Sequence, residues 1–399
     1  MRVLQLTDKT ASSGGIGTYV EMVSSGLRQR GHDVQCIRLL ANNFISTTTD
    51  QNIEWRMPQS YHALTALPQI HHWRKLLFRL RPDIIHIHAG FTSLSPLLLS
   101  YLKKNYRVVA TLHDVRPFCP RGSRRFKNTE DICERVVGTD CIASDCLPEG
   151  GGRIGSLFRL LNERWMRREW RTMARLMLPS QYLRQLCLLH GFDDAHLSVV
   201  SHATKLPEIE KSRKEEEPTG LIYIGSLLPN KGASHFIAML EKLKHRDWEA
   251  HIVGDGPLRN ALQTIVDSSG LTSRIHFHGR LATSERDALL ARMRMLVFPT
   301  LLPESFGLVG IEAFAQGIPV VSYEIAGVTE WLRDGVNGLA VPFGDIEKLV
   351  IAVERLLDDS DLAHILGQRG RKMVETSFNE ELCIARIEAV YQEVSEIAV

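Results

Sequence analysis

The sequence has no apolar run long enough to cross a membrane. Its longest strongly apolar stretches, such as LSPLLLSYL at residues 94–102, are well short of the roughly 20 residues that a membrane-spanning helix needs. The N-terminus lacks the anatomy of a signal peptide, because Asp8 interrupts the first apolar run too early. With 44% hydrophobic and 24% charged residues, the chain has the composition of a globular protein, which we expect in the cytoplasm.

Several patterns of catalytic and cofactor sites are also missing. No Ser-His-Asp order or activated cysteine indicates a covalent nucleophile, and no Asp-x-Asp motif stands where a catalytic metal would be needed. A glycine-rich segment follows the first predicted strand, but Val20 occupies the place of the last glycine in G-x-G-x-x-G. The second predicted strand ends in RLLANN, without an acid to bind a ribose. A dinucleotide-dependent dehydrogenase is therefore disfavoured.

Short β-branched runs alternate with helical patterns along the chain, which is typical of parallel sheets wrapped by helices. We expect two doubly wound α/β domains, residues 1–205 and 220–376, joined by a polar linker, residues 206–219, that is bracketed by prolines. Residues 377–399 predict a C-terminal helix that packs back on the N-terminal domain through an apolar face. That face consists of Cys383, Ile387, Val390, Tyr391 and Val394.

Charge is divided unevenly between the two halves. Residues 1–205 hold 28 Lys and Arg against 17 Asp and Glu, whereas the remainder holds 20 against 29. In IGSLFRLLNERWMRREWRTMARL, arginines recur at helical spacing and apolar residues form another face. Either this helix lies on an anionic membrane surface on the acceptor side, or its apolar face packs on its own sheet and the arginines are solvated. No nucleic-acid-binding motif accompanies the charge. The arginines are Arg164, Arg168, Arg171 and Arg175, and the apolar residues are Leu157, Leu161 and Trp165.

The stretch PTLLPESFGLVGIEAFAQGIPVVS places Glu304 in a loop and Glu312 in the second turn of a helix that follows Gly307. Eight helical positions span about 12 Å, so the two carboxylates are poorly placed to act on one bond as a glycosidase pair. The unpaired amides at the helix start favour an anion such as a diphosphate, and the flanking carboxylates accept hydrogen bonds from hydroxyls. This arrangement predicts a nucleotide-sugar ligand. The amides concerned are those of Phe306, Gly307 and Leu308.

The string ESFGLVGIE resembles the E-x7-E signature of the retaining glycosyltransferases of the GT-B fold, family 4, also called glycosyl transferases group 1. The resemblance extends over nearly the whole chain. It implies two Rossmann-like domains facing each other across a cleft, with Glu304 holding hydroxyls of the transferred sugar and Glu312 holding the ribose. The segment IGSLLPNKG resembles the family's diphosphate-binding loop, and Lys231 matches its lysine. Many members have an arginine where this chain has Ser226, so one expected cation is missing.

Three further segments are similar to family segments that surround the donor. In IVGDGP, Gly254 matches a strand end where the backbone approaches the nucleotide base. In TASSGGIGTYV, Gly15 and Gly17 match a loop that closes over the donor phosphates. In VVATLHDV, His113 matches a histidine that touches the donor sugar or phosphate. The resemblance implies that these residues contact the donor. His86 and His88 have a similar placement, and we assign them no role.

The resemblance also implies a mechanism and substrates. The acceptor attacks from the side of the leaving group with retention of anomeric configuration, while Lys231 and the helix start stabilise the departing diphosphate. Neither a metal nor another cofactor is required. The implied donor is a UDP- or GDP-linked hexose or N-acetylhexosamine. The implied acceptor is a glycan or a polyprenyl-diphosphate-linked glycan at the inner membrane face, in cell-surface polysaccharide biosynthesis.

Other classes within the same fold stay open. A GT-B epimerase would act on a nucleotide sugar without an acceptor, and a phosphorylase would need pyridoxal phosphate. A non-catalytic partner would bind a sugar nucleotide without turning it over. The joint presence of Glu304, Lys231 and Glu312 argues against the non-catalytic interpretation.

Four of the seven cysteines, Cys119, Cys133, Cys141 and Cys146, fall within one segment, residues 117–152. Their intervening gaps of 13, 7 and 4 residues lack the repeated C-x2-C of strong zinc motifs, and a cytoplasmic location disfavours disulfides. The segment is too long for a plain connection. The cysteines are therefore either unrelated thiols or a structural zinc site that orders the segment.

Overall fold

The chain forms two compact units in a computed structural model. Unit 1 comprises Met1–His202 together with Glu380–Val399, and unit 2 comprises Ala203–Asn379. Most of the predicted linker, residues 208–219, lies outside the residues that the structure describes. No helix of the described residues is both long and apolar enough to span a bilayer. The described residues are 1–8, 14–41, 46–49, 52–57, 66–88, 94–127, 131–144, 146, 152–207 and 220–396.

Unit 1 is built on an eight-stranded sheet in the order β3-β4-β2-β1-β5-β6-β7-β8. All neighbouring strands are parallel except β3 and β4, an antiparallel pair that the sequence did not predict. The central strands β5 and β6 are buried along their whole length, as expected where helices cover both faces of a parallel sheet. The strands are β1 (Arg2–Thr7), β2 (Asp33–Ala41), β3 (Ser46–Thr49), β4 (Asn52–Met57), β5 (Ile84–Ile87), β6 (Val108–Thr111), β7 (Arg175–Leu178) and β8 (Leu197–Val199).

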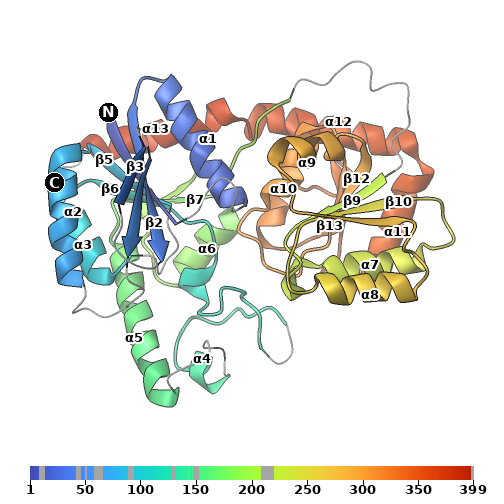
Figure 1. The fold of residues 1–399 in the computed structure, drawn as a ribbon, viewed down its shortest axis with the longest axis horizontal. Helices are drawn as coiled ribbons and strands as arrows, with labels where there is room; N and C mark the ends of the chain where they lie inside the picture. The colour runs from blue at the N-terminus through green and yellow to red at the C-terminus, as the bar shows by residue number, and fades with distance from the viewer. Residues whose placement is uncertain are drawn as a thin grey trace. The chain divides into compact units, whose positions relative to one another are not determined.

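Helices of unit 1 come from both ends of the chain. The C-terminal helix α13 packs beside α1, which Figure 1 shows, and its predicted apolar face is buried. This confirms that the helix returns to the N-terminal domain. The helices are α1 (Gly15–Gln29), α2 (Ala66–Leu80), α3 (Pro96–Asn105), η3 (Arg116–Phe118), α4 (Asp140–Ala143), α5 (Gly152–Arg171), α6 (Gln181–Leu189), η4 (Asp194–His196) and α13 (Glu380–Glu396).

Unit 2 is built on a six-stranded parallel sheet in the order β11-β10-β9-β12-β13-β14. Numbered within the unit, this is the 3-2-1-4-5-6 order of the doubly wound fold, which reverses between β9 and β12. Ligands of such sheets bind at the carboxyl ends of the strands, at the point of reversal. The strands are β9 (Gly220–Ile224), β10 (Glu249–Val253), β11 (Ile275–Gly279), β12 (Met293–Phe298), β13 (Val320–Tyr323) and β14 (Gly338–Val341).

The helices of unit 2 follow its strands, and after β14 the chain is helical, as predicted. Two doubly wound α/β units therefore confirm the predicted fold class. The helices are η6 (Pro229–Lys231), α7 (Ala233–Lys242), α8 (Arg259–Ser268), α9 (Thr283–Leu290), α10 (Leu308–Ala315), η7 (Ala326–Glu330), α11 (Ile346–Asp358) and α12 (Ser360–Ser377).

Candidate functional site

The candidate site of unit 2 begins with an ion pair at the reversal point of its sheet. Lys231 follows β9, Glu304 follows β12, and the Lys231 ammonium lies 2.7 Å from Glu304 Oε1. Thr300 Oγ1 donates a second hydrogen bond of 3.0 Å to the same carboxylate oxygen. Glu304 keeps 12% and Lys231 25% of its side chain exposed, so both are largely but not fully shielded from water. The structure thus brings together two residues that lie 73 positions apart in the chain.

A glycine allows this close approach of the two loops. Gly232 has φ +77°, and a Cβ at this position would lie 1.8 Å from the backbone oxygen of Pro299. Any other residue would push the loop after β9 away from the loop after β12. Gly232 therefore lets Lys231 reach Glu304.

Helix α10 starts directly after the loop that carries Glu304. Its N-cap is Gly307, in the left-handed conformation at φ 87°, and the first amides of such a helix have no partner within it. The Phe306 side chain is fully buried, and its carbonyl accepts a 2.7 Å hydrogen bond from Trp331 Nε1. The structure thus places Gly307 and Leu308 at the helix start, where anions are favoured in general, whereas the phenyl ring of Phe306 belongs to the core.

Glu312 lies in the second turn of α10, as predicted, and pairs with an arginine that the sequence did not single out. Arg286 Nη2, on α9, lies 3.1 Å from Glu312 Oε1. Burial raises the pKa of the Glu312 carboxyl, and the guanidinium opposes this shift. In the sequence, TSERDALL resembles an ordinary solvated helix, so nothing local could have identified Arg286.

The structure also describes Gly254, a predicted donor position, and Ser226, which stands where many family members have an arginine. Gly254 has φ +144°, and a Cβ there would lie 1.9 Å from the Gly225 carbonyl oxygen, so the packing of the two strand ends already requires glycine. Ser226 is exposed, and its carbonyl accepts a 3.3 Å hydrogen bond from the Tyr223 hydroxyl. The side chain that replaces the family's usual arginine thus has no role in the core.

In unit 1, the predicted residue His113 belongs to a buried chain of imidazoles. His113 Nε2 lies 3.2 Å from His88 Nδ1, and His113 Nδ1 lies 3.4 Å from His202 Nε2. Burial lowers the pKa of His113 to about 3, so its ring is neutral. Since both nitrogens already have partners, a contact between His113 and a donor requires one of these bonds to be exchanged. Gly15 and Gly17 lie in the first turn of α1, where Gly15 is exposed and Gly17 is buried.

Helix α5 decides between the two alternatives for its apolar residues. Leu161 and Trp165 are 52% and 38% exposed, and they share an exposed face with Arg164 and Arg168 at i, i+3, i+4 and i+7. Of the two alternatives for this helix, the one in which Leu161 and Trp165 pack on the sheet is therefore wrong. The buried positions are instead Glu163, Met166, Arg167 and Trp170, with Glu163 and Arg167 forming a 3.7 Å ion pair. The Leu157 side chain lies outside the described residues.

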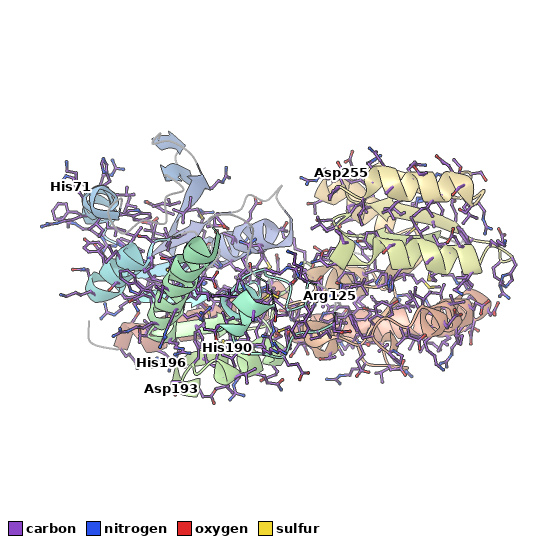
Figure 2. The ribbon with its side chains drawn as sticks, turned by 90° about the horizontal axis from the view of Figure 1, so that it is seen from below. His71, Arg125, His190, Asp193, His196 and Asp255 are labelled. Carbon is purple, nitrogen blue, oxygen red and sulfur yellow. The ribbon has the colours of Figure 1, made fainter. Side chains whose placement is uncertain are left out.

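Arg171 departs from the other basic residues of α5. Its guanidinium donates to the backbone carbonyl of His190, the C-cap of α6 labelled in Figure 2. It also lies 5.7 Å from the Phe192 ring centre. Arg171 thus ties α5 to its own unit, whereas Arg164 and Arg168 face solvent.

The four clustered cysteines are all free thiols, and Cys119 and Cys146 are buried. Burial raises the pKa of the Cys141 thiol, and the other three thiols are near enough to add to this shift. Within the described part of the chain, however, no group of three or more His, Cys, Asp or Glu side chains is arranged to hold a metal ion. The predicted zinc site therefore gains no support from the geometry.

Comparisons with known proteins match both units. The sequence profile of "Glycosyl transferases group 1" matches residues 205–373, and that of "Glycosyltransferase Family 4" matches residues 13–206. The chain is 25% identical to alpha-D-kanosaminyltransferase of Streptomyces kanamyceticus, over 79% of each protein. It is 28% identical to a GDP-mannose-dependent alpha-(1-6)-phosphatidylinositol monomannoside mannosyltransferase of Mycobacterium tuberculosis, over 45% of this chain and 48% of that protein.

Solved structures share the fold at lower identity. Sucrose-phosphate synthase from Thermosynechococcus elongatus superposes with a TM-score of 0.73 at 18% identity, over 98% of this chain and 99% of that one. Anabaena HepE in complex with UDP gives a TM-score of 0.73 at 16% identity, over 98% of this chain and 100% of that one. Two doubly wound units, a lysine and two glutamates at a sheet reversal, and two matching profiles lead to one assignment. The chain belongs to the family 4 glycosyltransferases, enzymes of the GT-B fold that transfer sugars from nucleotide donors.

Proposed function

We propose that this enzyme is a retaining, metal-independent glycosyltransferase. It moves a hexose or N-acetylhexosamine from a UDP- or GDP-sugar to a hydroxyl of a glycan or lipid-linked glycan in cell-surface polysaccharide biosynthesis. The observation that carries the proposal is the 2.7 Å ion pair between Lys231 and Glu304, directly before the N-terminus of α10. The ion pair and the start of α10 together provide a cation, a helix N-terminus and a carboxylate that can accept hydrogen bonds from hydroxyls. All three lie at the reversal point of the unit 2 sheet.

Each of these groups has a distinct task in the proposed reaction. The donor diphosphate lies against the first amides of α10 and the Lys231 ammonium, which stabilise the charge that builds up as the nucleotide departs. Glu304 already accepts two protein donors, and a carboxylate has about four acceptor positions, so capacity remains for sugar hydroxyls. Glu312 accepts the ribose hydroxyls. Gly15, Gly17 and Gly254 approach the donor through their backbones, and His113 contacts it after exchanging a histidine partner.

The acceptor side of the proposal rests on helix α5. Its exposed face presents Arg164 and Arg168 beside Leu161 and Trp165, a combination that suits an anionic lipid surface. The Mycobacterium tuberculosis relative is named for a phosphatidylinositol-mannoside acceptor, and a Staphylococcus aureus relative is named for capsular polysaccharide biosynthesis. These names support an acceptor that is a glycolipid or a polysaccharide precursor. A cytoplasmic enzyme that works at the inner membrane face on a polyprenyl-diphosphate-linked acceptor is our proposal.

A screen of nucleotide sugars tests this function. UDP-, GDP- and ADP-sugars are added singly, and a ligand that binds the folded protein raises its melting temperature. Glu312→Ala should abolish the shift, and a full shift in that variant would remove the ribose assignment.

Proton NMR of the product then reports the anomeric configuration, and unchanged rates in EDTA would support metal independence. Isomerised nucleotide sugar without an acceptor would indicate an epimerase. A pyridoxal absorbance band would indicate a phosphorylase, and binding without turnover a non-catalytic partner.

A further inference from the structure

Glu312 sits in an environment that opposes its charge. Its side chain keeps only 13% of its surface exposed, and burial is the largest influence on its carboxyl, raising the pKa. Asp287, a second negative charge nearby, raises the pKa further. Arg286 is the cation that opposes both effects from α9, at 3.1 Å.

The Arg286 guanidinium is itself held in place. Its Nε and Nη2 donate hydrogen bonds of 2.9 and 2.7 Å to Asp287 Oδ1, and Nη2 also reaches Glu312 Oε1. Its side chain is 20% exposed. Although burial alone lowers the pKa of Arg286, the pairs with Glu312 and Asp287 raise it, so the cation is permanent. A fixed guanidinium with two carboxylate partners sets the orientation of both.

This geometry assigns a role to an arginine outside the E-x7-E motif. We propose that Arg286 is a positioning residue of the donor site, which keeps Glu312 ionised and turned so that its remaining acceptor capacity faces the ribose hydroxyls. Arg286 acts through Glu312 and does not touch the donor. The inference rests on the proposed function, since it assumes that Glu312 is the ribose ligand.

The test compares Arg286→Gln, Arg286→Lys and Glu312→Gln with the wild type. Isothermal titration gives the Kd of UDP and of GDP, each alone, at pH 6.0 and pH 8.5. Each variant is expressed as a Kd ratio to the wild type at the same pH, which cancels the titration of the nucleotide phosphate. Without the guanidinium, Glu312 takes up a proton at low pH and loses its strength as an acceptor. At pH 8.5 Glu312 stays ionised and only its orientation is lost, so we expect Arg286→Gln to weaken binding about threefold. At pH 6.0 protonation of Glu312 adds to this loss, and we expect about tenfold weaker binding, since one pKa unit corresponds to a factor of ten.

The two other variants serve as controls for this effect. Glu312→Gln cannot titrate, so its ratio should be the same at both pH values. Arg286→Lys keeps the positive charge but not the planar guanidinium, so its Kd at pH 6.0 should lie between the Kd of the wild type and that of Arg286→Gln. If Arg286→Gln fails to give a cooperative melt, Arg286→Lys decides the question. Wild-type affinity of Arg286→Lys at both pH values would then overturn the inference.

A double variant separates this inference from the function on which it rests. With Glu312→Gln already present, Arg286→Gln should add almost no further loss, because the two residues act as one unit. Fully additive losses, or an Arg286→Gln ratio independent of pH, would overturn the positioning role. If Glu312→Gln itself binds both nucleotides like the wild type, the ribose assignment of the proposed function fails instead.

Discussion

His86 and Tyr391 lie 305 residues apart in the chain and share a 2.7 Å hydrogen bond inside unit 1. Tyr391 belongs to α13 and His86 to β5, so the bond joins the C-terminal helix to the centre of the first sheet. The other nitrogen of His86 lies 2.8 Å from Thr111 Oγ1 on β6. Helix α13 is thus part of a hydrogen-bonded network with His86 and Thr111, which adjoins the His88 ring.

Tyr391→Phe should destabilise unit 1. It removes one partner and leaves His86 Nδ1 buried without its hydrogen bond, which costs about 1–3 kcal/mol. Calorimetric unfolding measures the loss. Gln392→Ala, at an exposed position of the same helix, is the control and should change stability by less than about 0.5 kcal/mol. Equal stability of Tyr391→Phe and the wild type would show that the bond contributes nothing.

Unit 1 should lose stability as the pH falls below about 6.5. Burial lowers the pKa values of His86, His88, His113 and His202, so the unfolded chain binds protons that the folded chain does not. The stability that these four histidines contribute is fully present above the pKa of an unfolded histidine, about 6.5. It is lost as the pH falls toward the pKa of the folded residue, which for His113 is about 3. Each histidine adds up to about 1.4 kcal/mol per pH unit.

Hydrogen exchange of the β5 and β6 amides at pH 7.5, 6.0 and 5.0 checks this dependence. His88→Asn removes one titrating group, so the slope of unfolding free energy against pH should fall by the amount that the uptake of about one proton accounts for. Gln392→Ala, which removes no titrating group from an exposed position of α13, should leave the slope unchanged. A stability that is flat from pH 7.5 to 5.0 would contradict the prediction.

Lys231→Ala should slow turnover by about 10²–10³-fold, the cost typical of removing one group that stabilises charge in a transition state. Lys231→Arg should retain intermediate activity. Initial rates with saturating donor measure the effect. Lys242→Ala, which removes an exposed lysine paired with Glu347, is the control and should match the wild type. An active Lys231→Ala enzyme would remove Lys231 from the catalytic assignment.

Reversing the charge of the exposed face of α5 should abolish binding to anionic vesicles. Arg164→Glu with Arg168→Glu places two acids where the proposal needs two cations, and each basic residue near such a surface contributes about 1 kcal/mol. Flotation with phosphatidylglycerol vesicles measures binding, and phosphatidylcholine vesicles give the neutral background. Arg369→Glu with Lys372→Glu makes the same charge change on exposed positions of α12. If both double variants bind equally well, α5 is not the contact.

The sequence predicted those features of the fold that depend on local pattern. Parallel strands buried on both faces appear as short apolar runs, so the alternation of strands and helices was predicted, and the start of α10 after Gly307 followed from the sequence. The pair β3 and β4 was missed because STTT and NIEWRM carry no such run. Lys231, Glu304 and Glu312 were found only because each stands in a recognisable string.

Contacts between distant residues were the part that the sequence could not supply. Arg286 and Glu312 belong to different helices, and the histidine chain joins the ends of three strands. The sequence left the covered face of α5 open, because Glu163 and Arg167 neutralise each other and are buried while Leu161 and Trp165 remain outside. Helical periodicity shows that a helix has distinct faces, but burial depends on what packs against them.

The return of α13 to unit 1 has a consequence for the order of assembly. Unit 2 is one continuous stretch, Ala203–Asn379, whereas unit 1 needs Glu380 onward to complete its core. A ribosome delivers the whole second unit before it delivers the partner of His86. The first half emerges first but is the last to become complete, and until then it exposes the apolar surface that α13 later covers.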